Sequence, residues 1–116
     1  METLPPRQQE IVLVAFPFSD GSQTKIRPAL VLSNNTYNRQ SRDVLICALT
    51  TKNHKSPYST RITPKDAHGE LHHTSFARSD ALARTDNTHI IKRLGTLNDE
   101  RFDQVTKKIS SLIQRT

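Results

Sequence analysis

The sequence predicts a mainly β protein with one C-terminal helix, and two observations support this fold class. Short apolar runs rich in Val, Ile and Leu alternate with polar, turn-rich segments, as expected for five to seven short strands. The last segment instead carries apolar residues at helical spacing. Strands followed by one amphipathic helix favour a small, partly open barrel packed against that helix. A length of 116 residues predicts a single domain, residues 1–116.

The strands are placed by the apolar runs and by the turn residues beside them. Pro5-Pro6 predicts that residues 1–9 form an N-terminal arm without regular structure. A ten-residue polar loop, Pro17–Ile26, separates the first two predicted strands. The predicted strands are Glu10–Phe16, Pro28–Ser33, Asp43–Leu49 and Ser59–Thr63, with one or two more in Leu71–Leu82 and another in His89–Leu94.

Local signals also describe the connections and the final helix. Asn34–Arg42 has room for one short helical turn, Gly69 indicates a turn, and Gly95 ends the last predicted strand. Asn98 is a capping residue, so the helix is expected over residues 99–114. Its apolar stripe consists of Phe102, Val105, Ile109, Leu112 and Ile113.

Composition limits the class of protein. Lys and Arg number 17 against 11 Asp and Glu, and the net charge of +6 favours nucleic acid or an acidic partner. No apolar run is long enough to span a bilayer, and residues 1–9 do not resemble a signal peptide, so a cytoplasmic protein is expected. Cys47, the only cysteine, permits no internal disulfide. It is either a small core residue or a nucleophile.

Arg27 stands before Pro28, at the mouth of the second predicted strand. A guanidinium held there by a stiff neighbour is suited to binding a phosphate. A surface ion pair at a strand entrance is the alternative interpretation, and the residue type alone leaves both open.

A resemblance to a known family starts in this region. The segments Val-Leu-Val-x-Phe-Pro-Phe-Ser-Asp-Gly-Ser (residues 12–22) and Lys-x-Arg-Pro-Ala-Leu-Val-Leu-Ser-Asn (25–34) resemble the N-terminal half of the MazF/PemK/Kid toxins. The resemblance implies a dimeric endoribonuclease of a type II toxin–antitoxin system, with the SH3-like barrel that these toxins share with the gyrase poison CcdB. It also implies an acidic antitoxin whose extended tail occupies the RNA groove.

Cleavage of RNA without metal needs a base for the 2′-hydroxyl and donors that stabilise the pentacovalent phosphorane. On the resemblance, Arg27 contacts the scissile phosphate and the hydroxyl of Thr50 binds phosphate or the 2′-oxygen. Arg78 and Asp80 match an Arg-x-Asp pair of the Kid branch, and their spacing in a strand puts both on one face. Asp80 is then the candidate base, whereas a surface ion pair is the alternative. No metal or cofactor is expected.

Further residues are expected to line a groove for single-stranded RNA. The candidates are Ser22, Gln23, Lys25, Arg39, Lys52, Lys55 and Arg84. The sequence departs from the family pattern at Ala81, where many members have Gln, and the first loop lacks a histidine found in Kid-like members. His68, Glu70 and His72 alternate as zinc ligands can on a strand, but solvated histidines are the simpler interpretation.

Two other functions remain open at this point. A CcdB-like protein would poison DNA gyrase through its C-terminal helix without RNA chemistry. A catalytically weakened relative would only bind nucleic acid or the antitoxin, and Ala81 keeps this alternative open.

Overall fold

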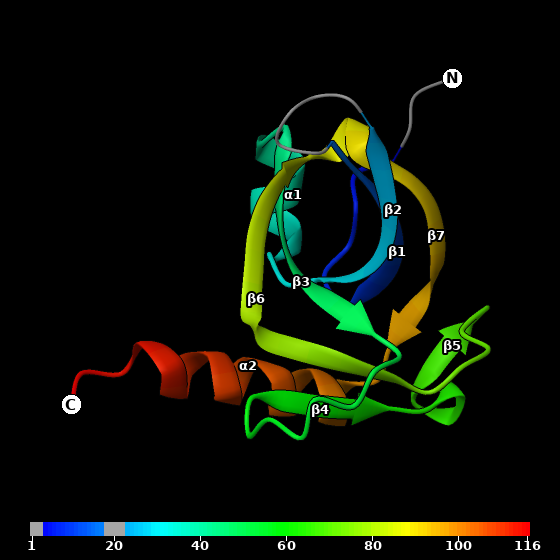
Figure 1. Ribbon diagram of the computed structural model, residues 1–116. Coiled ribbons are helices and arrows are strands. Elements are labelled where there is room, and N and C mark those ends of the chain that lie inside the picture. Colours follow the sequence, from blue (N-terminus) through cyan, green and yellow to red (C-terminus); the bar gives the residue numbers. More distant parts are fainter. Residues whose placement is uncertain (1–3, 18–22) are drawn as a thin grey trace.

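A computed structural model describes residues 4–17 and 23–116 as one antiparallel sheet with a C-terminal helix (Figure 1). The sheet has seven strands in the order β4-β6-β3-β2-β1-β7-β5. Its edge strands, β4 and β5, form no pair with each other in the described ranges, so the barrel is open. The predicted fold class is confirmed. The strands are β1 Glu10–Pro17, β2 Thr24–Val31, β3 Asp43–Thr50, β4 Ser59–Ile62, β5 Ala67–Gly69, β6 Ser75–Asp86 and β7 Ile90–Leu97.

Two α-helices and two short 3-10 helices complete the described chain. Helix α1 (Asn35–Gln40) follows β2, and helix α2 (Asp99–Ile113) matches the predicted helix closely. The 3-10 helices are η1 (Pro64–Asp66) and η2 (Asn87–His89). No helix in residues 4–17 and 23–116 has the length and apolar character needed to cross a membrane.

The predicted ten-residue loop Pro17–Ile26 is wrong at both ends. Strand β1 continues to Pro17, and β2 already begins at Thr24, where β-branched Thr24 and Ile26 alternate with basic residues. Pairing of Phe16 with Lys25 and of Val14 with Arg27 places this part of β2 in a hairpin with β1. Arg27 therefore lies within a strand rather than at its entrance.

Gly69 and Gly95 are strand residues that face each other across β5 and β7, instead of forming a turn and a strand end. A Cβ on Gly69 would lie 2.3 Å from the carbonyl oxygen of Leu94, and the φ of Gly69 is +132°. Two residues without side chains let these backbones approach closely, and β7 continues past Gly95 to Leu97.

The sheet buries apolar side chains on both faces. On the face covered by α2, Ile11, Leu30 and Cys47 join Phe102 and Val105 of the helix. The opposite face has its own buried cluster, Val12, Val14, Ala29, Val31, Val44 and Ile46. Burial raises the pKa of the Cys47 thiol to about 12, so Cys47 is a core residue rather than a nucleophile.

Helix α2 packs on β6 and β4 from its first turn to about Ile109, and its C-terminal end extends past the sheet (Figure 1). Asn98 caps the helix by accepting a hydrogen bond from the backbone N–H of Arg101. Phe102 and Val105 are buried, whereas Leu112 and Ile113 are exposed, the latter by 78%. The predicted apolar stripe is thus packed at one end and uncovered at the other.

Asp66 fixes the start of α2 against η1. Its carboxylate accepts hydrogen bonds from the backbone N–H and hydroxyl of Thr63 and lies 3.4 Å from the guanidinium of Arg101. Burial opposes the charge on Asp66, but the Thr63 hydrogen bonds and Arg101 outweigh it and lower the pKa of Asp66.

We expect the stabilising effect of Asp66 to depend on pH. Because its pKa is lower folded than unfolded, its contribution is present above the unfolded value of about 3.9 and is lost as pH falls through the folded pKa. Asp66→Asn should therefore lower the urea midpoint at pH 7 and much less at pH 2.5. An equal difference between the two proteins at both pH values would contradict this assignment.

We expect Gly69→Ala to lower the free energy of unfolding by about 2 kcal/mol or more, because the new Cβ would meet backbone atoms of β7. Thr96→Ala, an exposed substitution in β7, is the matched control and should change stability by less than about 0.5 kcal/mol. Urea titration followed by circular dichroism measures both. Equal midpoints for the two variants would show that the close approach is absent.

Candidate active site

A register shift between β3 and β6 shapes the candidate site. Leu49 pairs with Ala77 and Cys47 with Leu82, so residues 78–81 of β6 stand opposite Ala48 alone. Such a bulge bends the strand and changes which residues face each side. The predicted residues Arg78 and Asp80 both lie in it.

Ser79 determines the direction of its neighbours. Its hydroxyl donates a 3.0 Å hydrogen bond to the carbonyl oxygen of Val105 in α2, and its side chain is fully buried. Because side chains alternate along a strand, Arg78 and Asp80 project from the face opposite to α2. The two side chains approach each other, with 3.4 Å between Nε of Arg78 and Oδ1 of Asp80.

The Arg78–Asp80 contact is long and imperfectly aligned. A second contact, from Nη2 of Arg78 to Oδ2 of Asp80, also measures 3.4 Å. Nε of Arg78 is buried but has no hydrogen bond of good geometry, and the same is true of the hydroxyl of Ser59 on the neighbouring strand. A buried donor without an acceptor is unfavourable.

Thr50 ends β3 next to this pair. It lies opposite Phe76, two residues before Arg78. Its hydroxyl oxygen accepts a 3.1 Å hydrogen bond from the backbone N–H of Lys52. The hydroxyl hydrogen therefore remains available to donate to a substrate oxygen.

Arg27 lies on the neighbouring strand and forms no hydrogen bond or ion pair with Thr50, Arg78 or Asp80. The described pairing of β2 with β3 ends at Ala29 and Ala48, and Arg27 and Thr50 each stand two residues beyond that pair. Both follow the same face of the sheet by alternation. Arg27 is exposed, and its Nη1 donates to the carbonyl oxygen of Ile26 at 2.9 Å. No ion pair joins it to another described residue.

The predicted groove residues separate into two sets. Lys25 shares the face and strand of Arg27, and Lys52 and Lys55 are exposed in the loop after Thr50. Gln23 is exposed at the start of the second described range, and Ser22 lies outside the described residues. Lys25 is thus two residues from Arg27, and Lys52 is two residues from Thr50.

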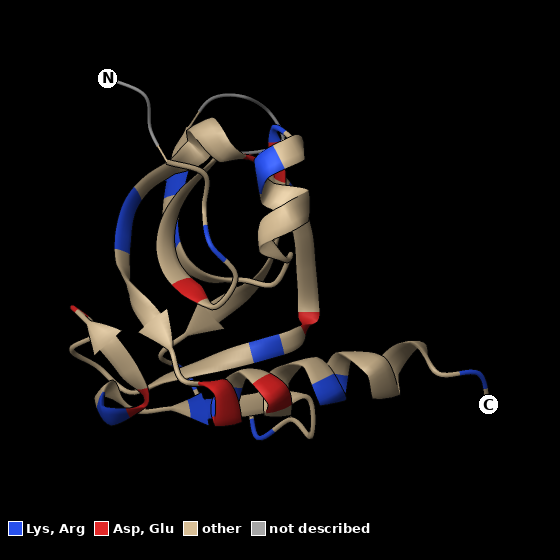
Figure 2. Cartoon of the chain, turned by 180° about the vertical axis from the view of Figure 1, so that it is seen from behind, with Lys and Arg blue, Asp and Glu red and all other residues tan. Residues whose placement is uncertain are grey.

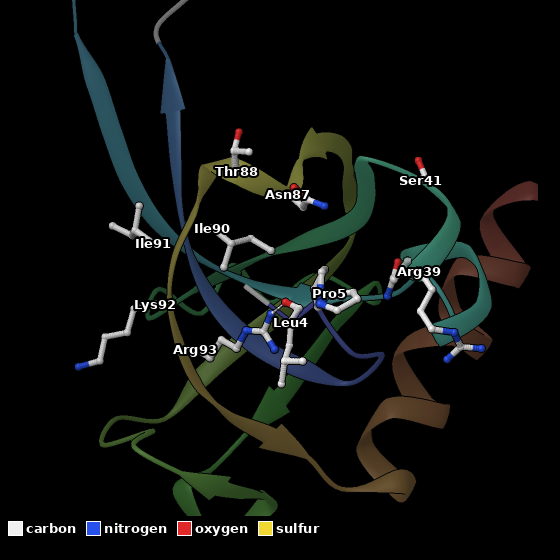
Figure 3. Close-up of a pocket in the computed structure, with 12 residues that line it drawn as sticks. Leu4, Pro5, Arg39, Ser41, Asn87, Thr88, Ile90, Ile91, Lys92 and Arg93 are labelled. Atoms are coloured by element: carbon white, nitrogen blue, oxygen red, sulfur yellow. Dashed lines mark hydrogen bonds between the residues drawn. The ribbon is translucent and has the colours of Figure 1, made fainter. Parts of the chain in front are cut away.

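Arg39 and Arg84 lie elsewhere. Arg39, on α1, lines a cavity of about 590 Å³ together with the N-terminal arm, η2 and β7, including Lys92 and Arg93 (Figure 3). Arg84 lies on the α2 side of β6, where it is 3.7 Å from Asp43. Lys and Arg are spread over several elements rather than gathered in one basic stripe (Figure 2).

The histidines do not form a metal centre. Within residues 4–17 and 23–116, no three His, Cys, Asp or Glu side chains are grouped as metal ligands. His68 is an exposed residue of β5, and Glu70 forms a 3.1 Å ion pair with Lys92.

Sequence reasoning missed three residues beside the site, Ser59, Arg61 and Phe76. Ser59 pairs with Arg78, and Arg61 pairs with Phe76, which in turn pairs with Thr50. The alternation in Ser-Thr-Arg-Ile indicated a strand, but which strand lay beside it could not be inferred from that pattern.

A separate apolar groove lies on the other face, between the sheet and the projecting half of α2. Its volume is about 540 Å³. Leu45 and Leu82 are 41% and 48% exposed there, and Ile109 contributes from the helix.

Comparison with known proteins identifies the family. The sequence pattern of the PemK-like, MazF-like toxins of type II toxin–antitoxin systems matches residues 7–113. The chain belongs to this toxin family. The resemblance in the N-terminal half therefore extends over nearly the whole sequence, including the bulge that carries Arg78 and Asp80.

Individual members of the MazF family are more distant. A protein named Endoribonuclease MazF from Staphylococcus saprophyticus is 24% identical over 93 residues, which cover 80% of this chain and 78% of that protein. The fold resembles MazF in a MazE–MazF crystal structure from Deinococcus radiodurans, with a TM-score of 0.81, 19% identity and coverage of 97% and 100%. A mycobacterial endoribonuclease solved with its cognate antitoxin gives a TM-score of 0.78, 18% identity and coverage of 96% and 99%. The structures support the fold.

Proposed function

We propose that the chain is the endoribonuclease toxin of a type II toxin–antitoxin pair and cleaves single-stranded RNA without a metal or cofactor. Family membership and the relative named Endoribonuclease MazF support the activity class. The observation that carries the proposal is the Arg78–Asp80 pair, presented by the bulge beside Thr50 on the face opposite to α2. Carboxylate, guanidinium and hydroxyl groups are what metal-free RNA cleavage requires.

Each residue has a role in the proposed reaction. The Asp80 carboxylate takes the proton of the 2′-hydroxyl, and the 2′-oxygen forms a bond to the adjacent phosphorus. Arg78 donates hydrogen bonds to the phosphorane oxygens, with Arg27 from the next strand and the Thr50 hydroxyl as further phosphate donors. The bond from phosphorus to the 5′-oxygen breaks, and that oxygen leaves with a proton from Arg78 or water. The products are a 2′,3′-cyclic phosphate and a 5′-hydroxyl.

Single-stranded RNA fits this site better than a duplex. The 2′-oxygen, the phosphorus and the leaving oxygen must align, and an unpaired backbone can adopt that geometry. Lys25, on the strand of Arg27, and Lys52 and Lys55, in the loop after Thr50, are exposed cations that would supply electrostatic attraction for the backbone. Cytoplasmic mRNA is the substrate class proposed, and a single reduced cysteine is compatible with that compartment.

The same surface suits an acidic antitoxin. The chain carries a net charge of +6, and an acidic extended segment over Lys25, Lys52 and Arg78 would compete with RNA. Relatives with this fold have been solved in complex with their antitoxins. The gyrase-poison alternative lacks comparable support, because the relatives described above are MazF toxins and endoribonucleases.

A homodimer through the apolar groove completes the proposal. Leu45, Leu82 and Ile109 leave apolar surface open between β3, β6 and α2, and Ile113 adds more at the projecting helix end. A second copy would cover this surface. Leu82 directly follows the bulge at residues 78–81 but faces α2, so the partner would lie on the side of the sheet opposite to the Arg78–Asp80 pair.

We expect Arg78→Ala and Asp80→Asn each to reduce the cleavage rate by about 100-fold or more, because each removes a group that acts in the transition state. The assay is cleavage of total RNA in EDTA, resolved on a denaturing gel. Arg42→Ala, an exposed substitution just before β3 and at the opposite end of that strand from Thr50, should cut like the parent protein. Parent activity that disappears in EDTA, or full activity in both site variants, would contradict the mechanism.

We expect Leu82→Asp to convert the dimer to a monomer, because it buries a carboxylate without a partner in the interface. Sedimentation velocity gives the oligomeric state, and Ile91→Asp, another exposed apolar position outside the groove, is the control. A parent protein that stays monomeric at high micromolar concentration would show that there is no dimer. A Leu82→Asp variant that stays dimeric would show that the interface lies elsewhere.

A further inference from the structure

Strand β4 extends the candidate active site by one more row of side chains. Arg61 of β4 lies opposite Phe76 of β6, and Phe76 lies opposite Thr50 of β3. The three residues form a line across three neighbouring strands. Adjacent strands are about 4.8 Å apart, so Arg61 stands roughly 10 Å from Thr50.

The row faces the same side as the Arg78–Asp80 pair. In β4, Thr60 and Ile62 are buried on the α2 side, so the alternation turns Arg61 and Ser59 the other way. In β6, Ser75 and Ala77 are buried on the α2 side, and Phe76 therefore shares the face of Arg78. The burial patterns of β4 and β6 thus agree that Arg61 and Phe76 face the same side of the sheet as the Arg78–Asp80 pair.

The row is open to a ligand. β4 is an edge strand, Arg61 is exposed, and Phe76 is half-buried. Within the described ranges no carboxylate forms an ion pair with Arg61. A partly exposed ring beside an unneutralised guanidinium offers a stacking surface for a base and a cation for a phosphate.

We propose that Arg61 and Phe76 form a second nucleotide subsite, which holds the nucleotide next to the one that is cut. The ring of Phe76 stacks on its base, and Arg61 binds its phosphate. The inference rests on the proposed function, because Arg61 and Phe76 can hold a neighbouring nucleotide only if Thr50 and Arg78 bind the RNA that is cut. It makes Arg61 and Phe76 positioning residues that fix where the chain crosses the catalytic pair.

The test measures binding separately from cleavage. The probe is a fluorescein-labelled, random-sequence 14-mer of 2′-O-methyl RNA, which keeps bases and phosphates but has no free 2′-hydroxyl to react. Fluorescence anisotropy at several salt concentrations gives the affinity and its salt dependence. The variants are Arg61→Ala, Arg61→Lys and Phe76→Leu, with Arg42→Ala as the exposed control outside the row.

The subsite predicts distinct results for the two residues. Arg61→Ala should weaken binding and lower the slope of log affinity against log salt by about 0.7, the value for one phosphate contact on a single strand, and Arg61→Lys should restore that slope. Phe76→Leu should weaken binding about tenfold with an unchanged slope, because stacking involves no counterion. In cleavage assays Arg61→Ala should raise KM while kcat stays within about twofold.

The outcomes separate this inference from the proposed function. If the parent protein does not cut RNA but Arg61→Ala still loses affinity and slope, the cleavage proposal fails and the subsite stands. If the parent cuts RNA and Arg61→Ala binds with parental affinity and slope, the subsite is wrong. Because Arg61 is exposed, its substitution leaves folding intact, and an unchanged urea midpoint confirms this.

Discussion

The register shift opposite Ala48 is the constraint on which the site depends. Residues 78–81 of β6 stand opposite the single residue Ala48 of β3. Within this bulge the hydroxyl of Ser79 donates a hydrogen bond to the carbonyl oxygen of Val105 in α2. With Ser79 turned toward the helix, Arg78 and Asp80 must face the other way. A regularly paired strand would put Ala77 and Leu82 on opposite faces, because five positions separate them, whereas the bulge lets both face α2.

The rest of the fold holds that bulge in place from both sides. The α2 face is filled by the cluster around Leu30, Cys47 and Val105, and the opposite face by the cluster around Val14 and Ile46. Because both faces of the central strands are buried, their register cannot slip without exposing apolar side chains. The candidate site therefore lies where the second cluster ends and the described pairing of β2 with β3 stops, on strands rather than on a loop.

Local pattern predicted the elements that depend on local chemistry. The strand cores around Val12, Leu30 and Ile46 follow from β-branched runs, and α2 follows from its Asn98 cap and spacing. Pattern failed where pairing with a distant strand decides the structure. Gly69 and Gly95 lie opposite each other, and β6 is a single strand, Ser75–Asp86, rather than one or two short strands within Leu71–Leu82. The candidate site of Arg27, Thr50, Arg78 and Asp80 stays a prediction from the family motif. Local pattern did not indicate Arg61, because only its pairing with Phe76 brings it near Thr50.

The chemistry of the cut ends tests the central claim most directly. The protein, purified free of any antitoxin, would be incubated with a single-stranded RNA transcript in EDTA, and the fragments analysed by mass spectrometry. Attack by the 2′-hydroxyl with Asp80 and Arg78 assisting predicts fragments with 2′,3′-cyclic phosphate and 5′-hydroxyl ends. Fragments with 5′-phosphate and 3′-hydroxyl ends, or an intact transcript, would contradict the account.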